Sequence, residues 1–360
     1  MFEERCRLRD LGLQVGTLDT GVLNTITDVP GVKVGHCTII EGEGKLQPGK
    51  GPIRTGVTVI LPHNGNVFRE KVRASSFVLN GYGKTIGLVQ INELGYIESL
   101  IGLTSTLNVS IVADALIDYH LKENPDIGIS TNSIGVVVGE CNDGYLNDLQ
   151  GRHVKKEHVF KAIETASKNM EEGCVGAGTG MTAFRLKAGI GTSSRKISTE
   201  DAEYFVGTIV LSNFGHKKEL TILGKKYYGE SDKELDVKED GSIIIVVATN
   251  APLNSRQLNR LAKRAAMGLS RTGSYSSYGS GDIIIAFSTA NKINHDNKDE
   301  IFQTTTLNES TKLFNQLLKA TVDATEEAIL NSMLTSHTMK GRDDRVIEAI
   351  SIEKIKEMFS

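Results

Sequence analysis

Residues 239–249 read Glu-Asp-Gly-Ser-Ile-Ile-Ile-Val-Val-Ala-Thr, a charged turn followed by an unbroken run of mainly β-branched residues. A run with no alternating polar residues is typical of a strand that is covered on both faces. Similar short runs, most of them bounded by glycine, predict further strands at 57–61, 86–91, 109–112, 134–138, 206–211 and 283–287. We expect helices to form the covering layers of these sheets.

Apolar residues at helical spacing predict such helices at 157–172, 255–269, 312–334 and 345–359. In the segment 312–334, Glu326 and Glu327 fall outside the apolar stripe, so we expect them off the core-facing side. Helices that alternate loosely with strands favour an α/β layered fold and argue against an all-β sandwich.

The composition indicates a folded protein of one large domain or two. The chain has 360 residues, of which 39% are hydrophobic and 24% charged, with a formal net charge of −3. Lysine and arginine are dispersed, so there is no electrostatic reason to expect nucleic acid as a partner. No stretch reaches the about 18 apolar residues of a membrane helix, and the first residues lack an apolar signal region. We expect a cytoplasmic protein that does not bind membranes.

Cysteine and histidine spacing gives no indication of a metal site. Cys6, Cys37, Cys141 and Cys174 form no CxxC pair, and none of the histidines belongs to an HExxH pattern. We therefore expect neither a metal nor a disulfide framework.

Ser242, at the head of the apolar run, is a candidate nucleophile. If the chain cut itself between Gly241 and Ser242, the new α-amino group, with an ordinary pKa of roughly 7.7–8.0, could accept the proton of the serine hydroxyl. The preceding segment 216–240 is highly charged, and we interpret it as a linker that could move away from the new terminus. The alternative is an ordinary junction between a loop and a strand.

Two other segments could contribute to such a site. The glycine-rich stretches 176–180 and 189–195 lack the order of a phosphate-binding loop, so we expect them to pack beside a buried site or to donate N–H groups to an oxyanion. The turn 274–282 leads into the strand at 283–287, and its Ser280 and Asp282 could relay protons if that strand lies near the one opened by Ser242. Alternatively, these two side chains only cap backbone groups.

Taken together, these segments resemble the DmpA/BapA family of self-processing aminopeptidases, which includes L-aminopeptidase/D-amidase-esterases and β-peptidyl aminopeptidases. The blocks that carry the resemblance run in family order over nearly the whole chain, at 26–36, 139–148, 176–180 with 189–195, 212–215, and 241–253 with 279–282.

The resemblance implies an αββα sandwich, similar to the N-terminal nucleophile hydrolases but differently connected, as in the DmpA/ornithine acetyltransferase type. It also implies that residues 1–360 form a single catalytic domain. Cleavage would divide this domain into an α chain, 1–241, and a β chain, 242–360. Such αβ units are expected to assemble as a homotetramer.

The resemblance also implies roles for individual residues. Ser242 matches the nucleophile, and Asn213 matches the amide that binds the oxyanion. Ser280 and Asp282 match the serine and the acidic partner that assist proton transfer. Glu140 and Tyr145 fall where the family contacts the free amino end of the substrate, although Glu140 could also be a surface residue at a strand end.

The implied reaction is acyl transfer to water from a small peptide, amino-acid amide or ester with a free amino group, without a metal or organic cofactor. Residue identities do not separate α-L-, D- and β-aminoacyl substrates. Two alternatives stay open. One is a self-processing acyltransferase, against which Ser242 counts because those enzymes typically carry threonine, and the other is an uncleaved protein that binds a small ligand or nucleotide through the glycine loops.

Overall fold

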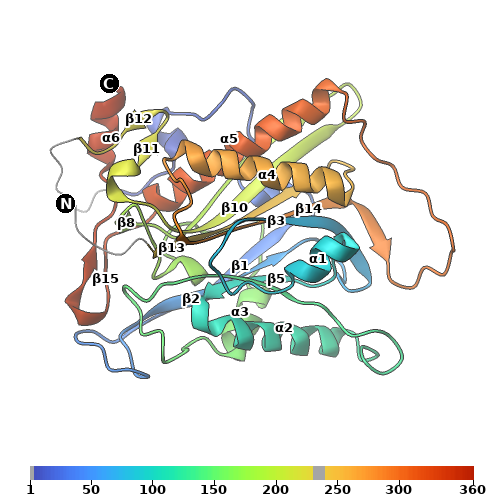
Figure 1. The fold of residues 1–360 in the computed structure, drawn as a ribbon, viewed down its shortest axis with the longest axis horizontal. Coiled ribbons are helices and arrows are strands. Elements are labelled where there is room, and N and C mark those ends of the chain that lie inside the picture. Colours follow the sequence, from blue (N-terminus) through green and yellow to red (C-terminus); the bar gives the residue numbers. More distant parts are fainter. Residues whose placement is uncertain (1–3, 230–239) are drawn as a thin grey trace.

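The computed structural model describes residues 4–229 and 240–360. Two β-sheets lie face to face, with helices α4 (Ser255–Arg271) and α5 (Lys312–Leu334) over one outer face. Helices α2 (Val109–Glu123) and α3 (Lys156–Glu164) cover the other outer face (Figure 1). These four layers confirm the predicted αββα architecture.

The larger sheet has the strand order β4-β3-β14-β13-β10-β9. Its strands are β3 (Glu70–Gly81), β4 (Tyr96–Ile97), β9 (Ile190–Ser198), β10 (Glu203–Asn213), β13 (Asp240–Thr249) and β14 (Gly279–Asn294). The central strand β13 pairs antiparallel with β10 and parallel with β14. The predicted strand opened by Ser242 therefore lies directly beside the predicted strand at 283–287.

The smaller sheet has the order β1-β2-β5-β6. Its strands are β1 (Lys33–Glu41), β2 (Ile53–Leu61), β5 (Ile101–Ser105) and β6 (Val137–Cys141). Short elements complete the fold, namely the helices α1 (Leu88–Leu94) and α6 (Ile352–Phe359) and the strand pairs β7 (Thr182–Ala183) with β8 (Leu186–Lys187), β11 (Thr221–Ile222) with β12 (Lys225–Lys226), and β15 (Met339–Lys340) with β16 (Val346–Ile347).

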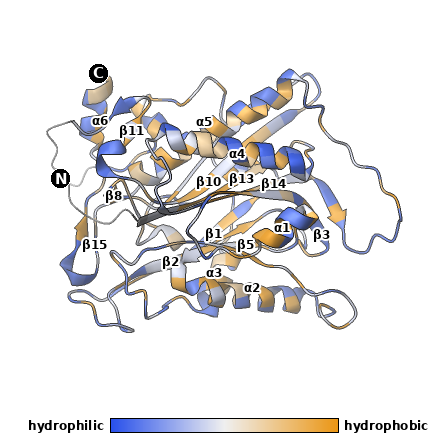
Figure 2. Ribbon diagram, viewed as in Figure 1, coloured by the Kyte–Doolittle hydropathy of each residue, from blue (hydrophilic) through white to orange (hydrophobic). Residues whose placement is uncertain are grey.

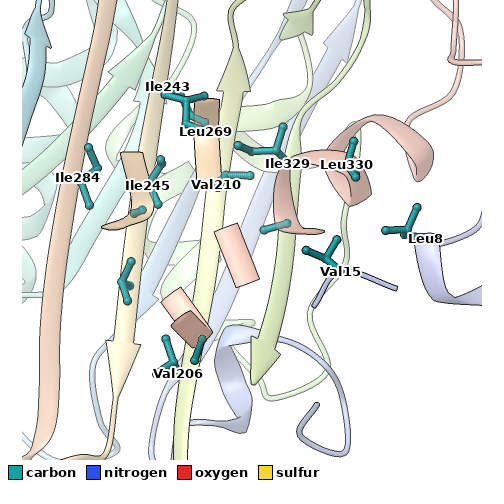
Figure 3. Packing of buried hydrophobic residues seen from close by; sticks show 14 of the residues in the cluster. Leu8, Val15, Val206, Val210, Ile243, Ile245, Leu269, Ile284, Ile329 and Leu330 are labelled. Carbon is teal, nitrogen blue, oxygen red and sulfur yellow. The ribbon is translucent and has the colours of Figure 1, made fainter. Parts of the chain in front are cut away.

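The strand β13 is buried on both faces, as its composition predicts. Ile243 and Ile245 pack into the cluster beneath α4 and α5, beside Leu269 and Ile329 (Figure 3). Ile244 belongs instead to the cluster between the two sheets. Hydrophobic residues dominate these inner layers, whereas α4 carries hydrophilic residues along its length (Figure 2). Burial on both faces explains why β13 needs no polar alternation.

Two predicted strands are wrong, because the segments 86–91 and 109–112 contribute to helices. Gly87 has φ +93° and precedes α1, and Gly95 with φ +71° follows it. The run 109–112 opens α2, whose buried residues recur at the three- and four-residue spacing of a helix. A short apolar run has the same appearance in a buried strand and in a buried helix, so its composition cannot decide between them.

Other boundaries also differ. The helix predicted at 157–172 ends at Glu164, and the helix predicted at 345–359 begins at Ile352, because residues 346–347 pair with β15. The strand predicted at 134–138 lies at Val137–Cys141. Part of the segment interpreted as a linker is the hairpin β11–β12, while residues 230–239 lie outside the described residues.

The expectation that Glu326 and Glu327 lie off the core-facing side is wrong, since both are buried. The Glu327 carboxylate accepts hydrogen bonds from the Arg195 guanidinium at 2.7 Å and from Arg9 at 3.0 Å. The N-terminal segment therefore covers this side of α5 and supplies a counter-charge for Glu327.

Candidate active site

Ser242 lies near the start of β13, where the central strand reaches the end of the sheet. In the strand register, it stands opposite Asn213 of β10 on one side and Gly281 of β14 on the other. Its side chain is largely buried, and its hydroxyl donates a hydrogen bond of 2.5 Å to the carbonyl oxygen of Gly241. The hydroxyl oxygen is therefore next to the carbonyl of the Gly241–Ser242 peptide bond.

Asn213 is the last residue of β10, and its amide is oriented by two main-chain groups. Its Oδ1 accepts a hydrogen bond from the N–H of Thr182 at 3.1 Å, and its Nδ2 donates to the carbonyl oxygen of Asn142 at 3.0 Å. The second bond uses one of the two N–H groups of the amide. The other N–H group is the one that could bind an oxyanion formed beside Ser242.

Ser280 and Asp282 form a hydrogen-bonded pair in the neighbouring strand, β14. The Ser280 hydroxyl donates to Oδ1 of Asp282 at 2.6 Å, and both side chains are buried. In the register, Gly241 stands opposite Ser280 and Ile243 opposite Asp282. Since side chains alternate along strands, this pair points to the opposite sheet face from the Ser242 side chain. It therefore flanks the main chain at 241–243 instead of the Ser242 hydroxyl.

Burial raises the pKa of Asp282, while the hydroxyl groups of Ser276 and Ser280 act in the opposite direction. Asn80 holds the turn before this carboxyl group, because its Nδ2 donates to the carbonyl oxygens of Ser277 at 3.0 Å and Ser280 at 2.5 Å. The pair is thus fixed by the strand register and by the side chain of Asn80.

A cavity of about 740 Å³ opens at this end of the sheet. Ser242, Asn213, Glu140 and Tyr145 all line it, so four of the predicted site residues come together. Ser280 borders a separate, smaller hollow that also contacts His216, the histidine after the Asn213 segment.

Glu140, near the end of β6, is buried, and so it is not a surface residue at a strand end. Its Oε1 accepts the main-chain N–H of Lys84 at 2.7 Å, and its Oε2 accepts the hydroxyl of Thr106. These two donors fix the carboxylate at the cavity wall. No local sequence signal indicates Lys84 or Thr106, because they reach Glu140 only through the antiparallel bridge between Ile86 and Val138 and through the pairing of β5 with β6.

Tyr145 is 41% exposed and lies next to an arginine that the sequence analysis missed. The Arg345 guanidinium lies 4.9 Å from the centre of the Tyr145 ring and donates to the Tyr145 carbonyl oxygen at 3.2 Å. Arg185 and Arg342 line the same cavity and were missed as well. Isolated arginines near the chain's charged loops carry no sequence pattern that distinguishes them from surface residues.

The glycine-rich segment 176–180 packs behind the site, as expected. The N–H groups of Gly176 and Ala177 bind the hydroxyls of Thr38 and Thr58. The buried ammonium of Lys187 donates to three main-chain carbonyl groups around this segment. Because the N–H groups of Gly176 and Ala177 are bound within the protein, they are not available as oxyanion donors.

Within residues 4–229 and 240–360, no group of three or more His, Cys, Asp and Glu side chains is placed to hold a metal ion. Among the helices of this part of the chain, none is both long enough and apolar enough to cross a membrane.

Comparison with known proteins identifies the family of this chain. The model of peptidase family S58 matches residues 24–347. Beta-peptidyl aminopeptidase BapA of Sphingosinicella xenopeptidilytica is 38% identical over 98% of this chain and 90% of its own length, and the protein of the same name from Sphingosinicella microcystinivorans is 39% identical over 98% and 91%.

Two solved structures are similar to this chain over nearly its whole length. The PH0078 protein from Pyrococcus horikoshii OT3 has a TM-score of 0.93 and 52% identity, with 98% of both chains covered. The L-aminopeptidase D-Ala-esterase/amidase from Ochrobactrum anthropi, described as a variant of the Ntn hydrolase fold, has a TM-score of 0.88 and 35% identity over 97% of this chain and 96% of its own. The chain therefore belongs to peptidase family S58, and it is an aminopeptidase with the layered fold of that family.

Proposed function

We propose that this protein cuts its own chain between Gly241 and Ser242 and then uses the released Ser242 as an N-terminal nucleophile. The observation that carries the proposal is the position of the Ser242 hydroxyl, 2.5 Å from the Gly241 carbonyl oxygen, at the end of a strand beside the cavity. A glycine before the scissile bond leaves the carbonyl open to attack.

The mature site would hydrolyse the first peptide, amide or ester bond of a small substrate. The Ser242 Oγ attacks the carbonyl carbon, the α-amino group of Ser242 accepts the hydroxyl proton, and this proton passes to the leaving amine or alcohol. Water then attacks the acyl-enzyme and releases the acid. The Asn213 Nδ2 stabilises the oxyanion in both steps, and the Glu140 carboxylate binds the substrate ammonium group.

Ser280 and Asp282 would act on the new amino terminus. Their register with Gly241 and Ile243 supports this role, because after cleavage the terminal nitrogen of Ser242 lies between those two positions. A hydroxyl and a carboxyl group beside that nitrogen can orient the amine and exchange its proton. Tyr145 would contact the amino end of the substrate, and the αβ units would assemble as a homotetramer in the cytoplasm.

The intact masses of the purified protein under denaturing conditions test this proposal. We expect two species that correspond to 1–241 and 242–360, and a single uncut, inactive species for Ser242→Ala. Ser212→Ala is a matched control, because Ser212 is also buried and its hydroxyl has no hydrogen-bond partner among the described residues. Continued cleavage of the Ser242→Ala chain would refute the proposal.

The same preparation tests hydrolysis against acyl transfer. Amides of one amino acid are incubated with and without a second amino compound as acceptor, and the products are identified by mass. We expect the free acid as the main product in both reactions. If the aminoacyl group passed mainly to the acceptor amine, the enzyme would be a transferase.

A further inference from the structure

One side of the Asn213 amide is held by a peptide group that also binds a buried lysine. The peptide group between Met181 and Thr182 donates its N–H to Oδ1 of Asn213 at 3.1 Å. The carbonyl oxygen of the same peptide group accepts a hydrogen bond from the Lys187 side chain at 2.8 Å. Because a cation draws electron density through the carbonyl group, it makes the N–H of Thr182 a stronger donor.

Lys187 is fully buried, and its contacts are those of an ammonium group. Its Nζ also donates to the carbonyl oxygens of Gly178 at 3.3 Å and of Ala188 at 2.5 Å, so three carbonyl groups match the three N–H donors of an ammonium. Burial lowers the pKa of Lys187, whereas Cys174 and the Asp143 carboxylate act in the opposite direction. The ammonium thus holds both ends of the β7–β8 hairpin.

The other side of the amide is held by a peptide group that leads into a buried carboxylate. Nδ2 of Asn213 donates to the carbonyl oxygen of Asn142 at 3.0 Å, and the N–H of that peptide group is the main-chain N–H of Asp143. Burial raises the pKa of Asp143 to about 6, while the surrounding hydroxyl and amide groups and its own N–H act in the opposite direction. A carboxylate close to this N–H makes the Asn142 oxygen a stronger acceptor.

Asp143 also fixes the chain that follows β6. Its Oδ2 accepts the hydroxyl of Thr55 in β2 at 2.6 Å, and its Oδ1 accepts the hydroxyl of Ser105 in β5 at 2.7 Å and the amide of Asn147 at 3.0 Å. A Cβ at Gly180 would come within 2.8 Å of the Asp143 Cβ, so the chain before β7 packs directly on this residue. The two segments that hold the Asn213 amide are therefore packed against each other.

These polar groups form one line from a cation to an anion, which we call the polar chain. It consists of the Lys187 ammonium, the Met181 carbonyl with the Thr182 N–H, the Asn213 amide, the Asn142 carbonyl with the Asp143 N–H, and the Asp143 carboxylate. Every donor points away from Lys187 and toward Asp143, an arrangement in which hydrogen bonds strengthen one another by about 10–30% per bond. The amide cannot turn over, because its Nδ2 would then face the N–H of Thr182.

From this arrangement we propose that Lys187 and Asp143 are positioning residues that hold the Asn213 amide, through the polar chain, in the orientation that binds the oxyanion. This inference rests on the proposed function, in which the remaining N–H of Asn213 binds the oxyanion formed beside Ser242. Neither positioning residue is among the described residues that line the cavity. Their effect is to orient the donor before the reaction, so that no reorganisation is needed when the negative charge develops.

The Asp143→Asn variant tests this inference, because it removes the charge and retains the shape of the side chain. The assay is run at about pH 8, where Asp143 is ionised, and kcat is expressed per mole of free Ser242 terminus. We expect kcat for an alanine amide to fall about 10-fold, which is less than the 10²- to 10³-fold for removal of an oxyanion donor. KM should stay within about twofold, because Lys84 and Thr106, and not Asp143, hold the Glu140 carboxylate.

A double-mutant cycle separates this positioning role from a general loss of stability. If Asp143 acts through Asn213, Asp143→Asn should change kcat by less than about twofold when Asn213 is already alanine. Asp148→Asn is the matched control, because Asp148 is also buried and binds the N–H of Gly51 at 3.1 Å and His153 at 3.0 Å, outside the polar chain. This control should leave kcat within about twofold of the unmutated enzyme.

Lys187→Met tests the cationic end of the polar chain, and we expect a similar fall in kcat that also disappears in the Asn213→Ala background. This variant leaves three carbonyl groups without their donor, so Asp143→Asn decides the question if Lys187→Met does not fold. A fall of less than about twofold for Asp143→Asn, or an equal fall with and without the Asn213 amide, would overturn this inference alone. An unchanged kcat for Asn213→Ala itself would overturn the proposed role of Asn213 as well.

Discussion

The Asn213→Ala variant separates oxyanion binding from structural support. In the structure, the Asn213 amide makes two hydrogen bonds to main-chain groups, to Thr182 and Asn142. Their loss costs about 2 kcal/mol in the free energy of unfolding, at about 1 kcal/mol each. If the remaining N–H group binds the oxyanion, kcat should also fall by about 10²- to 10³-fold.

The same strand pair offers a control for the structural part. Asn250, at the opposite end of β13, also makes two main-chain hydrogen bonds, from the Phe205 N–H at 2.7 Å and to the Glu203 carbonyl oxygen at 3.0 Å. Asn250→Ala should therefore lower the free energy of unfolding by a similar amount without a loss of kcat, because Asn250 does not line the cavity.

The assay counts active sites before it measures rates. The proposed self-cleavage would also form an oxyanion, at the Gly241 carbonyl, so the Asn213→Ala chain should be cut more slowly. The amount of cut chain is determined from intact masses, and kcat for an alanine amide is expressed per mole of free Ser242 terminus. Urea unfolding of both variants gives the stability change. If Asn213→Ala retained kcat within about threefold of Asn250→Ala, Asn213 would not be the oxyanion donor.

Three further changes have defined outcomes. Glu140→Gln should lower kcat/KM for substrates with a free amino group by about 10- to 100-fold, because an ammonium–carboxylate contact becomes a neutral one. The selectivity is the ratio of kcat/KM for an amide with a free amino group to kcat/KM for its N-acetylated form. The same ratio in wild type and Glu140→Gln would contradict the role of Glu140 as the ammonium site. Burial raises the pKa of Asp143 from 3.8 to about 6, so the folded protein keeps a proton that the unfolded chain releases, and the free energy of unfolding should fall by at most about 3 kcal/mol as pH rises through that window. The difference between wild type and Asp143→Asn in urea unfolding at pH 4, 5 and 6.5 isolates this contribution; a difference that is constant with pH would show that Asp143 has an ordinary pKa. Arg152→Gly should raise the free energy of unfolding by up to about 1 kcal/mol, because Arg152 is exposed and glycine adopts its φ of +45° without strain; a decrease in urea unfolding would show that the arginine contributes more to stability than its backbone strain costs.

The centre of the fold could be predicted because its strands are continuous and apolar. The run after Ser242 is too apolar to form an exposed element, and its partner strand after Asp282 is equally apolar. The runs at 86–91 and 109–112 are shorter, and their tertiary contacts decide their conformation. The burial of Glu327 depends on Arg9 and Arg195, which are far from it in sequence and reach it only in the folded chain.

The candidate site likewise contains residues that motifs identify and residues that only the folded chain brings together. Ser242, Asn213, Glu140 and Tyr145 could be named from their motifs and all line the cavity. The donors that fix Glu140 and the arginines that line the cavity could not be named, because no sequence pattern marks them and only the folded chain brings their segments together. The strand register adds information that no motif contains, since it places Ser280 opposite Gly241 and Asp282 opposite Ile243, on either side of the proposed cleavage site.

The order of strands in the larger sheet determines how the two pieces of the proposed cleavage would be held together. Strands β14 and β13 belong to residues 242–360 almost entirely, and they lie between β3 and β10 of the first 241 residues. The shorter piece is thus inserted into the middle of a sheet whose two edges belong to the longer piece, and removing it would expose unpaired strands on both sides. The proposed cleavage would change unfolding from an event that releases intact chains into one that releases two pieces per chain, so the melting temperature should rise more steeply with concentration for the cut protein than for the uncut Ser242→Ala chain.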